Sequence, residues 1–299
     1  MRTAIQLTAE AGPWTELVEY VTEAEQLGVN YCWVAKAWGG DAASPIAALS
    51  QHTDRMIFGS GIFQVGARSA ANTAMVALTL KRVTSDRFVL GLGAGHGSHL
   101  WNNHGVQLER PLTRTREYVR VVRETVAHGQ VAFEGQVVQA PALSFEVATP
   151  RQPVPIYLAA LGSKMATLAG KIGDGVLFNM GPTQYLAEAV DTLRAAAVSV
   201  GRDPEQVDVA ALVIAGTGST GEQVCRETIA RWVSPEMPFY QTLLRDCGFA
   251  ADVDRIEAAL ADGGWEAAGR AVSDELLDDV ALVGDPATWR DKLARLHDV

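Results

Sequence analysis

The sequence predicts an α/β fold in which helices cover a parallel sheet. Short runs of Val, Ile and Leu alternate with helical patterns along most of the 299 residues. Strands that are apolar almost throughout are typical of parallel sheets buried on both faces. No break in composition divides the chain. Eight strand–helix units therefore favour a (β/α)8 TIM barrel, one domain over residues 1–299, over a doubly wound sheet.

Each predicted strand is a short apolar run bounded by polar or glycine-containing segments. Seven strands are expected at Thr3–Thr8, Tyr31–Ala35, Met56–Ile62, Phe88–Gly95, Ile156–Leu161, Gly175–Asn179 and Val207–Ala215. The eighth place stays open, because either Val280–Val283 fills it or the sequence stops before the last strand.

The intervening helices show apolar residues at helical spacing and end at glycines or turn residues. They are expected at Trp14–Leu27, Pro45–His52, Ala70–Val83, Arg114–His128, Ser163–Ile172 and Thr183–Val200, with a last helix opened by Asp285 and Pro286. Two insertions interrupt the alternation. A loop and a small hairpin, Val131–Val138, follow the fourth strand, and a helical stretch, Thr220–Asp279, follows the seventh.

Composition excludes several classes of protein. The net charge of −10 makes a sequence-independent interaction with nucleic acid or an anionic membrane unfavourable. The three cysteines are far apart, which argues against a disulfide framework, and Cys32 lies within an apolar strand. No window resembles a membrane span or a signal peptide. We therefore expect a cytoplasmic protein that binds a small molecule, and neither nucleic acid nor membrane.

One strand runs into an unusual glycine pattern, "FVLGLGAGHGSHLWNNHG" (88–105). Its glycines fall at every second position, at residues 91, 93, 95 and 97. A dinucleotide-binding fingerprint needs G-x-G-x-x-G, so this spacing excludes it. The pattern instead indicates bare backbone at the carboxyl end of a strand, where barrel enzymes place their active sites.

Three stretches together resemble the luciferase-like monooxygenase superfamily, in particular its deazaflavin-dependent branch. They are "RMIFGSGIFQVGARSAANTAMVALTLKRVTSDRFVLGLGAG" (55–95), "RPLTRTREYVRVVRETVAHGQVAFEG" (110–135) and "VPIYLAALGSKMATLAGKIGDGVLFN" (154–179). The resemblance implies hydride transfer between coenzyme F420 and a small organic substrate, with reduction of a C=C, C=N or C=O bond or the reverse. An FMN-dependent monooxygenase and a non-catalytic cofactor-binding protein remain alternatives. A homodimer is also expected.

The resemblance assigns two segments to the cofactor. A cis peptide at Gly61–Ile62 would support the ring, although Gly61 alone could equally relieve crowding in the barrel. The Gly162–Ser163 helix start would bind phosphate through free N–H groups and the helix dipole, although Ser163 could equally be an ordinary cap. The residues assigned to the cofactor are Gly61, Ile62, Gly93, Ala94, Gly95, Ala160, Leu161, Gly162 and Ser163.

Catalysis needs a proton donor beside the hydride. The resemblance implies an acid or a histidine just after the second strand, where this sequence has Lys36, so Lys36 and His96 are the candidates. Lys36 could equally be solvated or pair with phosphate. Zinc needs three fixed ligands and a supporting second shell, whereas His96, His99 and His104 lie in an expected loop whose only nearby carboxylate is Glu109, so no metal is expected.

Aromatic residues in loops over the barrel mouth are predicted to line a pocket for an apolar or aromatic substrate. They are Trp38, Trp101, Trp232 and Phe239, whereas Trp33 is expected in the core. The sequence leaves the identity of the substrate and the direction of hydride transfer open.

Overall fold

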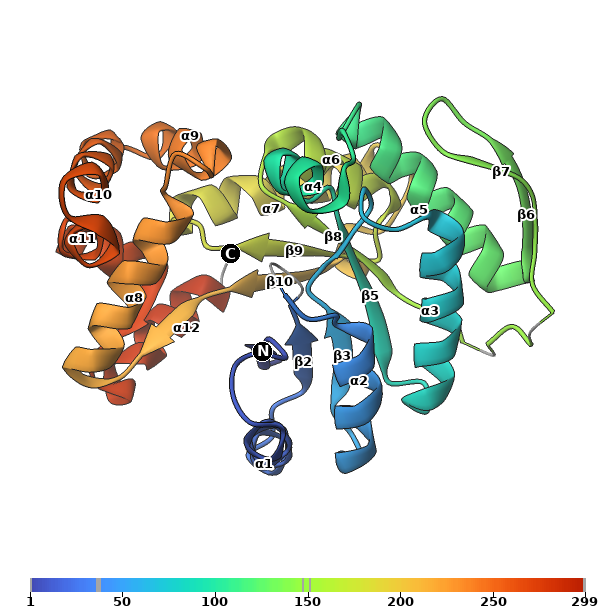
Figure 1. Cartoon of the computed structure of the whole chain (residues 1–299), viewed down its shortest axis with the longest axis horizontal. Helices are drawn as coiled ribbons and strands as arrows, with labels where there is room; N and C mark the ends of the chain where they lie inside the picture. Colours follow the sequence, from blue (N-terminus) through green and yellow to red (C-terminus); the bar gives the residue numbers. More distant parts are fainter. Residues whose placement is uncertain (1, 36–38, 147, 151, 298–299) are drawn as a thin grey trace. The chain divides into compact units, whose positions relative to one another are not determined.

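The computed structural model describes residues 2–35, 39–146, 148–150 and 152–297 (Figure 1). The strands of its main sheet follow one another in chain order: β1 (Ala4–Leu7), β2 (Tyr31–Val34), β3 (Ile57–Ser60), β5 (Phe88–Gly93), β8 (Ile156–Ala160), β9 (Gly175–Asn179) and β10 (Asp208–Leu212). The pairs β1–β2, β2–β3, β3–β5 and β5–β8 are parallel. The prediction of an α/β fold with a parallel sheet is therefore confirmed.

Helices connect these strands as expected for βαβ units. They are α1 (Trp14–Gln26), α2 (Ala43–Leu49), α3 (Ala70–Val83), α4 (Gly97–His104), α5 (Pro111–His128), α6 (Ser163–Ile172), α7 (Thr183–Val198), α8 (Gly218–Trp232), α9 (Pro238–Asp246), α10 (Ala250–Arg270), α11 (Asp274–Val280) and α12 (Trp289–His297). Short 3-10 turns lie at Ser50–His52, Pro204–Gln206 and Pro286–Thr288. No helix in the described part of the chain is long and apolar enough to cross a membrane.

The described residues divide into two compact units. Unit 1 lies within Met1–Ala159, Lys171–Leu177 and Gln206–Asp208. Unit 2 lies within Ala160–Gly170, Phe178–Glu205 and Val209–Val299. In unit 1, helices α2 and α3 pack against strands β3 and β5 (Figure 1).

An aromatic cluster packs on the strands of unit 1. The ring of Trp33 is stacked on Tyr31 with centroids 6.1 Å apart and meets Tyr157 at 5.5 Å. Trp33 is only 8% exposed, which confirms the prediction that it is a core residue. Arg2 donates hydrogen bonds to both Tyr31 and Asp208, and the Tyr157 hydroxyl donates to Asp208.

A cis peptide bond divides the strand predicted at Met56–Ile62. β3 stops at Ser60, the Gly61–Ile62 bond is cis as expected, and the chain resumes as β4 (Phe63–Gln64). Both β3 and β4 pair with β5, so one predicted strand makes two contacts with its neighbour. The next strand ends at Gly93, two residues before the predicted boundary.

The insertion after β5 differs from its prediction in two places. The segment expected to be a loop contains helix α4, which Leu100 fixes because its fully buried side chain lies against Gly66. The hairpin predicted at Val131–Val138 instead comprises β6 (Gln130–Glu134) and β7 (Gln139–Ser144). Residues 136–138 form the turn, because their N–H groups donate to the carboxylate of Glu117.

Unit 2 contains the insertion after the seventh strand. The helical stretch predicted at Thr220–Asp279 divides into α8 to α11, and Pro238 is the first residue of α9. These helices enclose a cluster whose fully buried members include Cys225, Ile229 and Val253. The last predicted strand exists as β12 (Ala281–Val283), which runs parallel to β11 (Ile214–Gly216). These two strands form a sheet of their own, so within the described residues β12 does not join the main sheet as an eighth barrel strand.

Candidate cofactor site

In unit 1 the end of β3 bulges over the glycines of β5. A Cβ at Gly91 would lie 1.9 Å from the carbonyl oxygen of Ser60. A Cβ at Gly93 would lie 2.3 Å from Cδ1 of Ile62 and 3.1 Å from the Cβ of Ala159. The alternate glycines therefore make room for the bulge that carries the cis peptide. The glycine pattern predicts bare backbone here, and the structure shows that the protein's own chain fills part of the space beside these glycines.

Hydrogen bonds fix this bulge against β5. The hydroxyl of Ser60 donates to the carbonyl of Gly91 at 2.9 Å and accepts the N–H of the same residue at 3.0 Å. On the other side, a Cβ at Gly59 would lie 2.3 Å from the indole of Trp33. The bulge is thus supported by packing from below, while Gly61 and Ile62 remain half-buried. It forms a wall that can contact a ligand, and we call Gly61–Ile62 with Gly93–Gly95 the ring wall.

The chain leaves the sheet directly after the buried Gly93. Ala94, Gly95 and His96 are half-buried. Gly95 has φ +77°, a conformation that favours glycine, and a Cβ there would lie 3.1 Å from the side chain of Gln64. His96 therefore follows the wall immediately, as the sequence predicted for a residue at a strand end.

The histidines of this segment stay near one another without forming a metal site. Nδ1 of His96 and the hydroxyl of Ser98 are 3.0 Å apart, and the rings of His96 and His99 are 5.1 Å apart. Within the described residues no group of three potential ligands is placed to hold a metal ion. His104 is exposed, and Trp101 in the same helix is 56% exposed. Lys36 and Trp38 lie outside the described residues.

In unit 2 the predicted phosphate turn leads from β8 into α6. Helix α6 starts at Ser163, and the Gly162 carbonyl accepts the N–H groups of Met165 and Ala166 at 2.9 and 3.0 Å. Gly162 and Ser163 are exposed, and a Cβ at Gly162 would have no heavy atom within 4 Å. The turn therefore leaves open space beside the first N–H groups of a helix, which suits an anion.

Three residues that sequence analysis did not assign lie around the same part of unit 2. The Tyr185 hydroxyl donates to the carbonyl of Leu161 at 2.6 Å. The side-chain amide of Asn179 donates to the phenol oxygen of Tyr240, also at 2.6 Å. Leu161, Tyr185, Trp232 and Tyr240 all pack against the buried cluster of unit 2. Asn179 could have been selected because it ends a strand, but no local pattern marks either tyrosine.

The two aromatic residues predicted in unit 2 for substrate binding behave differently. Trp232 is half-buried, and its ring centroid lies 4.9 Å from that of Tyr240. Phe239 is 65% exposed. The structure therefore brings Trp232 next to the polar group formed by Asn179 and Tyr240, whereas Phe239 faces solvent.

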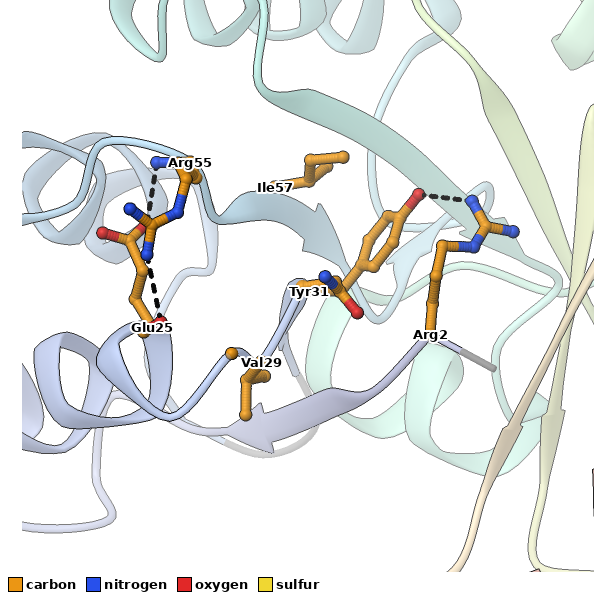
Figure 2. A pocket seen from close by; sticks show the side chains of 8 residues that line it. Arg2, Glu25, Val29, Tyr31, Arg55 and Ile57 are labelled. Carbon is orange, nitrogen blue, oxygen red and sulfur yellow. Dashed lines mark hydrogen bonds between the residues drawn. The ribbon is translucent and has the colours of Figure 1, made fainter. Parts of the chain in front are cut away.

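A cavity of about 310 Å³ lies at the opposite, amino ends of the first strands of unit 1 (Figure 2). Arg2, Tyr31, Arg55 and Ile57 contribute to its lining, and Arg2 donates to the Tyr31 hydroxyl at 3.0 Å. The buried carboxylate of Glu25 accepts the N–H groups of residues 54–56. Burial would raise the pKa of Glu25, but these N–H groups lower it overall. These hydrogen bonds connect the start of β2 to Arg2, and connect α1 to the segment that precedes β3.

Comparison with known proteins defines the class of this chain. Residues 1–299 match the family described as luciferase-like monooxygenase. The chain therefore belongs to the luciferase-like monooxygenase family, whose members are oxidoreductases.

Several relatives are similar along nearly the whole chain. A 5,10-methylenetetrahydromethanopterin reductase of Methanolobus tindarius is 30% identical over 96% of this chain and 88% of its own. A Mycobacterium tuberculosis protein named as a coenzyme F420-dependent oxidoreductase is 28% identical over 98% of this chain and 92% of its own. The F420-dependent tetrahydromethanopterin reductase of Methanopyrus kandleri has a similar fold, with a TM-score of 0.87 at 23% identity over 99% of this chain and 90% of that one.

Proposed function

We propose that this chain is a coenzyme F420-dependent oxidoreductase that transfers a hydride between the deazaflavin and a small organic substrate. The observation that carries the proposal is the similarity, over more than nine-tenths of the chain, to an M. tuberculosis protein named for F420. The M. tindarius reductase, similar over the same length, supports an oxidoreductase that acts on a small organic molecule.

The residues of the candidate site suit such a cofactor. The ring wall carries Ile62 on a bulge that glycines accommodate, and most of its residues are glycines, which expose backbone to a ring. The open Gly162–Ser163 turn offers helix N–H groups to a phosphate. F420, when bound, would supply the hydride chemistry, while the protein holds it, excludes water and supplies a proton.

Two residues remain candidates for the proton donor. His96 follows the ring wall, and histidine is the side chain used most often as a general acid or base. Lys36 is the residue at the position where the resemblance places an acid. Once a substrate is found, alanine at the donor position should lower turnover by about 100-fold with the cofactor Kd unchanged. Parent turnover in both single variants and in the double variant would exclude both residues.

Titration of the purified protein tests the proposed cofactor. Oxidised F420, reduced F420 and FMN are added separately, and binding is followed by the fluorescence and absorbance of the added cofactor. The proposal expects saturable binding of F420 and weaker binding of FMN. Saturable binding of FMN alone would contradict it.

An FMN-dependent monooxygenase is the second candidate. A Baeyer–Villiger monooxygenase of Pseudomonas putida, solved in complex with FMN, shares the fold with a TM-score of 0.71 at 16% identity over all of this chain and 88% of that one. Both cofactors carry a ribityl phosphate, so the Gly162–Ser163 turn suits either one. A third possibility, a cofactor-binding protein without catalysis, predicts that F420 binds but that its oxidation state never changes with any substrate tested.

A further inference from the structure

Asn179 and Tyr240 form a hydrogen bond at the carboxyl end of β9. Neither residue was assigned to the cofactor above. Asn179 is the last residue of that strand, and its amide donates to the Tyr240 oxygen over 2.6 Å. Tyr240 comes from the first turn of α9, far along the chain. Because ligands of such folds bind at the carboxyl ends of the strands, this pair stands at the edge of the sheet where a ligand is expected.

The backbone directly after Asn179 has an unusual conformation. Met180 has φ +36°, although it is not a glycine, and its side chain is 1% exposed within the buried cluster of unit 2. Its N–H donates to the carbonyl of Leu212 at 3.3 Å. Such conformations persist only where the surroundings enforce them, and they collect at functional sites. The turn thus fixes where the Asn179 side chain leaves the sheet.

Packing holds the Tyr240 ring from a second direction. Trp232, the last residue of α8, meets it at 4.9 Å with the ring planes inclined by 56°. Both rings lie against the buried cluster of unit 2. The phenol oxygen therefore has a defined position, set by Trp232 on one side and by the Asn179 amide on the other.

The Tyr240 hydroxyl differs from three other buried tyrosine hydroxyls in whether a protein group accepts its proton. Tyr185 donates to Leu161, Tyr118 to the carbonyls of residues 68 and 69, and Tyr157 to Asp208. The Tyr240 oxygen instead accepts a hydrogen bond from Asn179. Its own proton then has no acceptor among the residues that the structure describes. A half-buried O–H group without a protein acceptor is suited to a ligand oxygen.

We infer that Tyr240 donates a hydrogen bond to an oxygen of the bound deazaflavin cofactor, and that Asn179 is its positioning residue. The inference rests on the proposed function. Leu161, at the predicted phosphate turn, packs against the same cluster as Tyr240, so the phenol and this turn belong to one part of unit 2. Burial raises the pKa of Tyr240 to about 12, so the phenol keeps its proton at neutral pH and acts as a donor rather than a base.

Cofactor binding to Tyr240→Phe tests the inference without a substrate. Kd is measured by fluorescence titration for F420 and for the ribityl-deazaflavin that lacks the phosphate. Loss of one hydrogen bond to a charged oxygen should weaken F420 binding about tenfold. A loss confined to F420 identifies an oxygen of the phosphate or of the acidic side chain attached to it as the acceptor, and an equal loss for both ligands identifies a ring or ribityl oxygen. Binding of both ligands within twofold of the parent overturns the inference.

A matched control separates this role from the general loss of a phenol. Tyr118 is a buried tyrosine of unit 1 whose pKa burial likewise raises to about 12, and Tyr118→Phe should leave both Kd values unchanged. Thermal unfolding of each variant shows that it is folded. Failure of the parent protein itself to bind F420 contradicts the proposed function instead, so the two failures are distinguishable.

A double-mutant cycle tests the positioning role of Asn179. Asn179→Ala should weaken F420 binding in the parent, because the phenol loses its fixed orientation, but should have no further effect in Tyr240→Phe. Equal losses in both backgrounds would show that Asn179 acts without Tyr240 and would overturn its assignment. This variant also provides a second route to the inference should Tyr240→Phe fold poorly.

Discussion

Ile62 occupies the space that a side chain on residue 93 would need. Cδ1 of Ile62 lies 2.3 Å from where the Cβ of that residue would stand, so the Ile62 side chain in its present position leaves no room for a Cβ at position 93. The relationship explains a pattern that the sequence displays but does not interpret, glycine at every second position of a buried strand. Before any ligand is considered, a Cβ at position 91 would collide with the backbone carbonyl of Ser60, and a Cβ at position 93 would collide with the end of the Ile62 side chain.

Gly93→Ala should disturb the ring wall. The new Cβ would force Ile62 away, which costs about 1–3 kcal/mol of stability for overpacking and moves the surface proposed to contact the ring. We expect a lower free energy of unfolding in urea and F420 binding weakened at least about tenfold. An unchanged Kd for F420 would show that the wall does not contact the cofactor.

A double variant separates the effect of the clash on stability from the effect of the wall on cofactor binding. Ile62→Ala combined with Gly93→Ala removes the clash and should recover most of the stability, but not the binding, because the ring loses its support. Gly91→Ala is the harsher comparison, since its Cβ would lie 1.9 Å from a backbone oxygen that cannot rotate away. That variant should be the least stable of the series, and recovery by Ile62→Ala is not expected for it.

Glu117→Gln should destabilise the protein in a pH-dependent way. The Glu117 side chain is 6% exposed and its carboxylate accepts the N–H groups of residues 136–138. Burial would raise its pKa, but these bonds lower it below the ordinary value of 4.5. A lowered folded-state pKa stabilises the fold above pH 4.5, and this stabilisation is lost as the pH falls through the folded-state pKa.

Urea unfolding between pH 7 and pH 3 measures this effect. Glutamine retains one acceptor oxygen, so we expect a loss of about 1–3 kcal/mol at pH 7 that shrinks toward pH 3. Glu124→Gln, on an exposed pair with Arg120 in the same helix, serves as the control and should change little. A constant difference between parent and Glu117→Gln at every pH would contradict the assigned ionisation.

Cys32 should resist alkylation in the native state. It is fully buried in β2, and burial raises the pKa of its thiol to about 12, so thiolate is scarce at pH 8. Mass spectrometry after iodoacetamide treatment should find Cys32 unmodified in buffer and modified in urea, with Cys247, which is partly exposed, reacting first. Rapid native labelling of Cys32 would show that its strand opens readily.

The strands of the main sheet could be predicted from the sequence because buried parallel strands are apolar almost throughout. Elements whose position depends on tertiary contacts could not be predicted in this way. Helix α4 lacks apolar periodicity and forms because Leu100 packs against Gly66. The hairpin was placed too early in the chain because Glu117, a residue of α5, fixes the turn from a distance.

The residues of the candidate site also differ in whether they can be located from the sequence. Residues that belong to strand ends, such as Ile62 and Gly162, can be located from the sequence since strands and glycines are visible there. Tyr240 and Tyr185 cannot, because they reach the strand ends from helices whose packing no local pattern encodes. Their roles depend on one hydrogen bond each, to Asn179 and Leu161.

Gly162→Val tests the phosphate turn with little risk to the fold. Gly162 is exposed, its φ lies outside the left-handed region, and a Cβ would meet no atom within 4 Å, so the thermal midpoint should change little. The branched side chain would cover the N–H groups at the start of α6, where a phosphate would bind. We expect F420 binding to weaken at least about tenfold, whereas the phosphate-free deazaflavin keeps its Kd. Gly162→Ala, which adds a smaller group at the same open position, should give an intermediate loss. Equal weakening of both ligands would place the obstruction near the ring, and an unchanged Kd for F420 would remove this turn from the cofactor site.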